Sequence, residues 1–396
     1  MASPDPLFGT PTDVFERIRA FRRDLHQHPE LSWQEQRTMK SIAARLAELG
    51  VAHRAGVAGT GVIADLPGLA DGPIIALRAD TDALPVHEET GLSFSSTHEG
   101  VMHACGHDGH TSMLLGATEM LLRDPPPTPV RLIWQPAEER AEGAPALIEE
   151  GVLEGVAMIF GGHVDRHYPP GFMAVTHGAV NASTDMFRIE IRGRGGHGAR
   201  PHEALDAVVV GSLMVTAIQT IVSREINPAH PSVISVGVFE AGTAPNVIAG
   251  RARLEGTIRA QDATVRAHLQ QSLERVASAI GMLHDALVTF ELIEGTPPLI
   301  NEGVAVELAQ QAAISVLGEA NVGPLATANM GGEDFACYLE HVPGCYVRFG
   351  GQVAGRESFP AHSSQFDFDE RTLAMGAAWF NAVARHAGRS LLGGAA

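Results

Sequence analysis

The sequence has few cysteines, a shortage of positive charge and no long apolar run, and each scarcity excludes a class of protein. Only three of its 396 residues are cysteines, which is too few for a disulfide framework and is typical of a reducing compartment. Lys and Arg number 28 against 46 Asp and Glu, and the formal charge of −18 disfavours nucleic acids and anionic membranes as partners. An anionic small molecule is not excluded, because one Arg in a cleft can outweigh a distant acidic surface.

Targeting signals are also scarce. Residues 1–13, which read MASPDPLFGTPTD, lack the basic and apolar regions of a signal peptide. The longest uncharged run, Ala207 to Ser223, contains Ser, Thr and Gln and is slightly short for a membrane span. We therefore expect a buried or interface helix there, and a cytoplasmic protein with neither nucleic acid nor membrane as a partner.

The pattern of strands and helices predicts two domains of the α/β class. Apolar strands at 60–66, 74–79, 130–135 and 157–161, with helices between the last three, indicate a mostly parallel sheet flanked by helices. From Ser183 the order becomes β-α-β-β-α-β, which is that of a ferredoxin-like α+β unit. We expect a discontinuous domain over 1–182 and 294–396, with a smaller domain inserted at 183–293.

Two helices are predicted to open the chain. Asp13 and Glu16 can cap the first helix, and Ser32–Glu35 has the pattern of a capping box for the second, which would run to Gly50.

The densest group of candidate metal ligands is HACGHDGH at 103–110. Cys105 and His107 are two residues apart, so on an extended strand they would point to the same side and suit Zn²⁺ or a similar metal. A glycine-flanked loop with solvated histidines has the same composition. Cys105 could also be a nucleophile with His107 as its base. That chemistry needs the base within hydrogen-bonding reach and oriented by a third group, and a parallel i, i+2 pair is poorly arranged for it.

Other candidate ligands follow predicted strands. Glu138 and Glu139 come after the strand that ends at Gln135, at the sheet edge where α/β proteins form sites. One carboxylate can bind a metal while its neighbour accepts a proton from water. His163 and His362 also follow strands, and each alone is typical of an ordinary loop histidine. Together the candidates supply one thiol, three imidazoles and a carboxylate. These five ligands are more than one tetrahedral metal site takes, and they would fill two metal centres.

Longer motifs resemble the amidohydrolase branch of the dinuclear metallo-aminoacylase and carboxypeptidase clan, which includes hippurate hydrolases and plant auxin-conjugate amidohydrolases. The resemblance covers nearly the whole chain. Its motifs are RDLHQHPELS at 23–32, RADTDALP at 78–85, the stretch at 103–110, QPAEE at 135–139, GGHGARPH at 195–202, APNVI at 244–248, GGEDF at 331–335 and HSSQFDF at 362–368.

The resemblance implies a role for each residue of the larger domain's site. Glu138 matches the general base, which takes a proton from water and passes it to the leaving amine, and Asp80 matches the acidic residue that orients a ligand histidine. The implied metal ligands are Cys105, His107, Glu139, His163 and His362.

The inserted domain resembles the family's lid, which often also forms the dimer. His197 matches a lid histidine that polarises the scissile carbonyl, in many relatives within the partner subunit's site. Asn246 and Arg259 match residues that hold the substrate's carbonyl and carboxylate, and a guanidinium suits a carboxylate. Each of these residues also has an interpretation without a substrate. His197 could be an ordinary loop residue, and Arg259 could be a solvated arginine on a strand.

The resemblance implies metal-dependent hydrolysis of N-acyl amino acids by a homodimer or homotetramer with two divalent ions per subunit, of Zn, Mn, Co or Ni. Departures from the family pattern at Gly162, at 164–168, at Ala361 and at Ser364 remove no implied ligand, but they put the substrate's identity in doubt. A dipeptidase or carboxypeptidase with the same site is the alternative, and a non-catalytic metal-binding protein is a more remote one.

Overall fold

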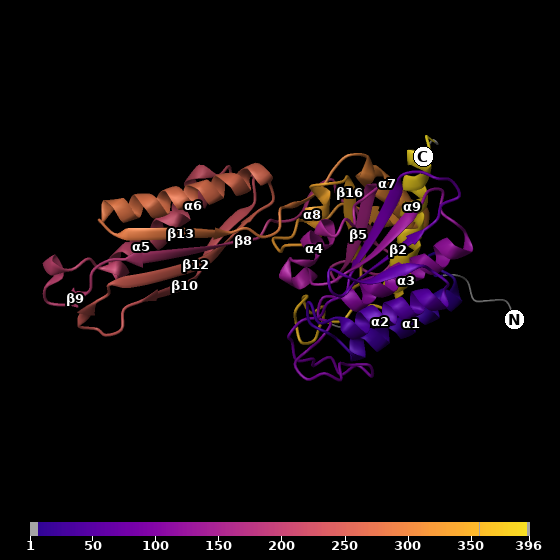
Figure 1. The fold of residues 1–396 in the computed structure, drawn as a ribbon, viewed down its shortest axis with the longest axis horizontal. Coiled ribbons are helices and arrows are strands. Elements are labelled where there is room, and N and C mark those ends of the chain that lie inside the picture. The colour runs from indigo at the N-terminus through magenta and orange to yellow at the C-terminus, as the bar shows by residue number, and fades with distance from the viewer. Residues whose placement is uncertain (1–6, 356, 394–396) are drawn as a thin grey trace. The chain divides into compact units, whose positions relative to one another are not determined.

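The computed structural model describes residues 7–355 and 357–393, which form two compact units (Figure 1). The first comprises Met1–Gly178, Asn301–Thr327 and Asp334–Ala396, and the second comprises Ala179–Ile300 and Ala328–Glu333. Both expected boundaries, 183 and 293, fall inside the second unit, and its short stretch Ala328–Glu333 was not expected. Residues 1–6, part of the segment without signal-peptide features, lie outside the described residues.

The first unit is built on an eight-stranded sheet with the order β1-β2-β4-β3-β5-β16-β6-β15. Its four central strands, β4, β3, β5 and β16, are parallel, which confirms the predicted α/β class. The strands are β1 (His53–Val57), β2 (Gly61–Leu66), β3 (Ile74–Asp80), β4 (Val130–Gln135), β5 (Val156–Asp165), β6 (Met173–Ala174), β15 (Val322–Gly323) and β16 (Gly344–Gly350).

Helices cover this sheet, and the most buried of them carries part of the candidate site. Nearly all of α3 is buried, because it packs against the sheet and against α1 and α9. Gly109 permits this close packing, since a Cβ there would lie 2.5 Å from the Phe368 ring. The helices are α1 (Thr12–Gln27), α2 (Gln36–Glu48), α3 (His107–Arg123), α4 (Gly143–Glu149), α7 (Val304–Leu317), α8 (Phe335–Leu339) and α9 (Arg371–Leu391), with short 3₁₀ helices at Glu138–Arg140 and Glu319–Asn321.

The second unit is an antiparallel sheet with the order β10-β12-β8-β13 and two helices, which confirms the ferredoxin-like arrangement. Strand β8 alternates buried and less buried residues, as its sequence predicted. The elements are β8 (Asp185–Arg192), α5 (Ala207–Glu225), β10 (Ser232–Ala241), β12 (Arg251–Ala260), α6 (Ala263–Leu283) and β13 (Leu287–Ile293). Shorter elements are β9 (Gly196–His197), a 3₁₀ helix at Pro201–Glu203 and β11 (Val247–Ile248), while β7 (Gly178–Asn181) pairs with β14 (Leu299–Asn301).

Helix α5 is, among the described residues, the one helix whose length and composition would suit a membrane span. Only 33% of its apolar window is buried, although α5 packs on β8, β10 and β12 of the sheet. One such helix is weak evidence of a span, because core helices of globular proteins have the same composition.

Two local predictions were wrong. Neither α1 nor α2 has a side-chain cap from the predicted residues; α2 starts at Gln36, and its first amides, those of Arg37 and Thr38, donate to Glu30. Cys105 and His107 do not lie on an extended strand, because Gly106 has a φ of +97° and α3 begins at His107. The glycine turns the chain between the two residues.

Candidate metal centre

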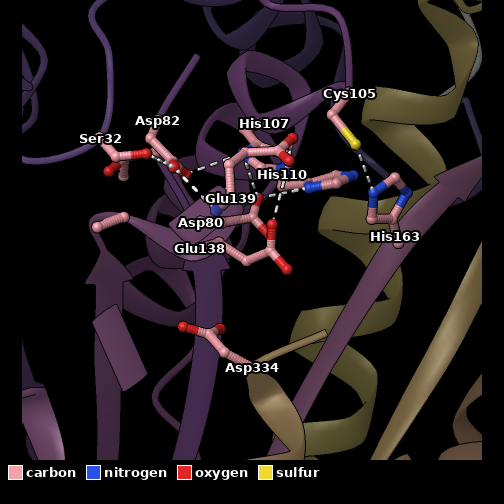
Figure 2. Close-up of polar contacts among 12 residues, drawn as sticks. Ser32, Asp80, Asp82, Cys105, His107, His110, Glu138, Glu139, His163 and Asp334 are labelled. Carbon is pink, nitrogen blue, oxygen red and sulfur yellow. Dashed lines mark hydrogen bonds and ion pairs between the residues drawn. The ribbon is translucent and has the colours of Figure 1, made fainter. Parts of the chain in front are cut away.

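Neighbouring strand ends gather the candidate ligands of the first unit. Because β3, β4 and β5 are parallel, Asp80, the Glu138–Glu139 turn and His163 meet at one edge of the sheet. The N-terminal end of α3 adds Cys105 and His107. In Figure 2, Cys105 and His163 lie on one side, Ser32 and Asp82 on the other, with His107 and the two glutamates between them.

The predicted ligands lie within a few ångströms of one another. Cys105 Sγ is 3.2 Å from His163 Nε2, and His362 Nε2 is 3.4 Å from Glu139 Oε2. His107 Nε2 is 3.8 Å from Glu139 Oε1 and 3.9 Å from Glu138 Oε2. Among the described residues, two groups of possible ligand atoms share the cysteine: Cys105 with His107 and His163, and Cys105 with Glu139 and His362.

His107 is oriented by Asp82, a residue to which the sequence analysis gave no role. Asp82 Oδ1 accepts from His107 Nδ1 at 3.2 Å, whereas Asp80 Oδ1 is 3.9 Å away. The backbone amide of Glu139 donates to the other oxygen of Asp82 at 3.0 Å, and so does the Ser32 hydroxyl at 2.7 Å. Asp82 therefore fixes both the imidazole and the start of the glutamate turn. The only sequence sign of it was a second carboxylate two residues after Asp80.

Asp80 orients a different histidine, His110. The His110 ring accepts from the Val164 amide at Nε2, so its proton is on Nδ1 and points to Asp80 Oδ1, 2.6 Å away. The ring then packs edge-to-face on His163, with ring centroids 4.7 Å apart. Asp80 thus supports His163 through His110, which was quoted in a motif but not assigned.

A buried ionic network lies beneath Asp80. Arg78 donates to Asp80 at 2.7 Å, to Asp334 at 2.8 Å and to Gln135 at 2.8 Å, and all four side chains are buried. Gln135 also donates to Asp334, and the Ala144 amide donates to the same carboxylate. The single Arg78 guanidinium therefore forms ion pairs with two buried carboxylates.

The centre has an excess of negative charge. Burial alone would lower the pKa of His107, but Asp80 and Asp82 hold it well above its usual value. Burial alone would raise the pKa of Asp80, but the charges of His107 and Arg78 and the hydrogen bond from His110 hold it well below its usual range. Burial and the Glu139 carboxylate raise the pKa of the Cys105 thiol, so a free Cys105 is a poor nucleophile.

The unpaired atoms of the centre fit a cation. His107 Nε2 and Glu139 Oε1 are buried and have no hydrogen-bond partner, which is costly for an imidazole and a carboxylate. They face each other beside a thiol and two more imidazoles, which are the donor types that zinc and similar transition metals take in proteins. A bound cation would satisfy both orphan atoms and take the place of the proton on His107.

The candidate residues of the second unit fall into two separate places. His197 in β9 pairs with Val247 in β11, and the Gly198 amide donates to the Asn246 carbonyl at 2.8 Å, so His197 and Asn246 are neighbours. Arg259 lies at the other end of β12 and donates to the Met330 carbonyl. At about 3.3 Å per residue, the strand from Gly250 to Arg259 spans about 30 Å. One small molecule cannot contact Arg259 and His197 of the same chain.

A family model and several known proteins match most of this chain. Residues 76–386 match the model of peptidase family M20/M25/M40. The chain is similar to N-acetylcysteine deacetylase of Bacillus subtilis, with 40% identity over 376 residues, covering 93% of this chain and 96% of that protein. It is also similar to thermostable carboxypeptidase 1 of Saccharolobus solfataricus, with 37% identity over 372 residues, covering 92% and 94%.

A solved structure is similar over almost the whole chain. It is a Bacillus subtilis protein described as a dinuclear metal binding peptidase of the M20 family, with a TM-score of 0.85 and 35% sequence identity, covering 96% of this chain and 99% of that one.

Proposed function

The chain belongs to peptidase family M20/M25/M40, and on that premise we propose that it hydrolyses N-acyl amino acids with a site that holds two divalent metal ions. The family and its relatives make the protein a metal-dependent amidohydrolase or carboxypeptidase, an enzyme that acts on amides. The proposal adds the substrate class and the roles of single residues.

The metal assignment rests on one observation. His107 Nε2 and Glu139 Oε1 are buried, face each other and have no hydrogen-bond partner. We assign Cys105, His107, Glu139, His163 and His362 as the ligands. Asp82 supports this assignment, because it holds the proton of His107 on Nδ1 and leaves Nε2 with a lone pair for a metal.

Glu138 is the proposed proton carrier. Bound divalent metal supplies Lewis acidity, which polarises the amide carbonyl and lowers the pKa of water. The Glu138 side chain is 12% exposed, so water reaches it, and it sits next to the ligand Glu139 on the same turn. It takes the proton of the attacking water and delivers it to the leaving amine nitrogen, which breaks the amide into a carboxylic acid and a free amino acid.

The substrate contacts proposed for the second unit divide between two chains. Arg259 offers a guanidinium for the substrate's carboxylate, and His197 with Asn246 offers donors for its carbonyl. Because about 30 Å of strand separates Arg259 from His197, we assign His197 and Asn246 to the site of a partner subunit. This division requires a homodimer at least, and also allows a homotetramer.

The second unit has an apolar surface suited to such a dimer. Val209 and Leu213 on α5 are 49% and 41% exposed, and Phe239 on the neighbouring edge strand β10 is 42% exposed. A two-fold axis would pair this face with the same face of a second copy.

We expect Val209→Lys together with Leu213→Lys to yield a monomer, because two charges would be buried in the pairing face. The matched control is Met282→Lys with Leu283→Lys, at the exposed end of α6, which should leave the mass unchanged. Light scattering on a sizing column measures the mass. If the Val209→Lys, Leu213→Lys variant remains a dimer, the interface lies elsewhere.

The test of the function itself is release of free amino acids from acetyl-, benzoyl- and indoleacetyl-amino acids after chelation, with and without added Mn²⁺ or Zn²⁺. We expect no cleavage after chelation and recovery on metal addition. Free dipeptides are assayed beside them, because one relative is a carboxypeptidase. Metal-restored cleavage of dipeptides alone would replace the N-acyl assignment, and no metal-restored cleavage of either would refute the proposal.

A further inference from the structure

The segment Ser32–Glu35 does not do what its pattern predicts. It has the spacing of a capping box, yet no side chain caps α2, and Glu30 accepts the first amides of that helix. Three side chains of the segment, those of Ser32, Trp33 and Glu35, instead bind residues that are far away in the chain. Of their four partners, Thr60 lies elsewhere, and the other three belong to, directly follow or hold the turn that carries Glu138 and Glu139.

Glu35 holds the residue that precedes Glu138. Its side chain is fully buried, one oxygen accepts from the Ala137 amide at 2.9 Å, and the other accepts from the Thr60 hydroxyl at 2.7 Å. Ala137 has a φ of +52°, a left-handed conformation that alanine keeps only where its surroundings enforce it. The amide held by Glu35 is therefore the one that starts the strained turn.

Ser32 and Trp33 hold the rest of the turn. The Ser32 hydroxyl donates to Asp82 Oδ2, which also accepts the Glu139 amide (Figure 2). The Trp33 indole donates to Glu142 at 2.5 Å, just beyond the turn's second left-handed residue, Ala141 at φ +56°. The turn is thus tied before, within and after the two glutamates.

We propose that Ser32–Glu35 is a positioning brace for the catalytic turn, with Glu35 as its central positioning residue. The brace holds Ala137 left-handed and so directs Glu138 and Glu139 toward His107. This rests on the proposed roles of Glu138 and Glu139. Glu35 acts through the turn and does not touch substrate or metal.

The decisive comparison is Glu35→Ala against Glu30→Ala. Each variant removes a carboxylate near the start of α2 that accepts two hydrogen bonds, but only the Glu35 carboxylate holds the turn. We expect Glu35→Ala to lower kcat and the affinity for Zn²⁺, measured by competition with a chromogenic chelator, by about 10- to 100-fold each. Glu30→Ala should lower only the melting temperature. Glu35→Gln keeps an oxygen for the Ala137 amide and should restore both quantities to within a few-fold of wild type.

A third readout needs neither metal nor turnover. Trp134 and Trp379 are fully buried, so acrylamide quenching of tryptophan fluorescence reports on Trp33. In the metal-free proteins, quenching should rise in Glu35→Ala and stay at the wild-type level in Glu30→Ala and Glu35→Gln.

The outcomes separate the two proposals. Wild-type kcat, Zn²⁺ affinity and quenching in Glu35→Ala would overturn the brace. Losses in Glu30→Ala equal to those in Glu35→Ala would also overturn it, since they would reflect stability alone. Wild-type protein that neither binds Zn²⁺ nor cleaves any amide would overturn the proposed function, while the quenching comparison would still decide whether Glu35 holds the turn.

Discussion

We expect Glu138→Gln to lower kcat by about 10²- to 10⁴-fold, because general acid–base catalysis contributes a rate factor of that size. The amide of Gln keeps the size of the side chain but cannot take a proton from water. The metal content should not change, because the unpaired buried atoms belong to His107 and Glu139. The measurement is kcat and KM on the best substrate of the N-acyl panel, together with metal analysis of the same sample.

Two further variants make that result specific. Glu139→Gln should lose metal as well as activity, because Glu139 has the orphan oxygen and contacts His362. Glu150→Gln, at the exposed end of α4, should behave as wild type. Turnover of Glu138→Gln near the wild-type level, with contaminating wild-type enzyme excluded, would refute the role of Glu138 as base.

Replacement of Arg78 by Met should cost about 3–5 kcal/mol in the free energy of unfolding, the range for removing one partner of a buried ion pair. Arg78 is 1% exposed, and both of its acidic partners, Asp80 and Asp334, are fully buried. Methionine fills much of the space but removes the guanidinium that pairs with both carboxylates. Urea unfolding of the metal-free protein measures the loss.

An exposed pair provides the comparison for Arg78. Arg19 pairs with Glu16 on the surface of α1, and Arg19→Met should change the free energy of unfolding by less than about 1 kcal/mol. An equally small change in Arg78→Met would mean that Asp80 and Asp334 are protonated or hydrated in the folded state. That result would contradict the ionic network described above.

Strongly patterned elements were predictable from the sequence. Strand β4 matches its predicted limits because a short apolar run is flanked by Pro129 and Pro136. Strand β8 alternates because one face of it packs on helices. In both cases the signal lies within a few consecutive residues, and the tertiary structure agrees with it.

The partners of the site could not be predicted in the same way. Ser32 and Glu35 satisfy a local capping pattern, but Asp82 and the Ala137 amide, about 50 and 100 residues further along, bind them instead. Local spacing contains no information on such contacts. The ligand set came from a resemblance, and the roles of its members stay predictions until the variants above are measured.

The path of the chain between the two units has a consequence for synthesis on the ribosome. Strand β5 ends at Asp165, but its neighbour in the sheet, β16, begins only at Gly344, after the whole stretch Ala179–Ile300 of the second unit. At about 5–20 residues per second, β16 follows β5 by roughly ten to forty seconds. During that interval one edge of β5 has no β16 to pair with, and such an edge is a template for aggregation. Abundant chaperone should therefore raise the soluble yield more than any change to the second unit, which is nearly complete by then.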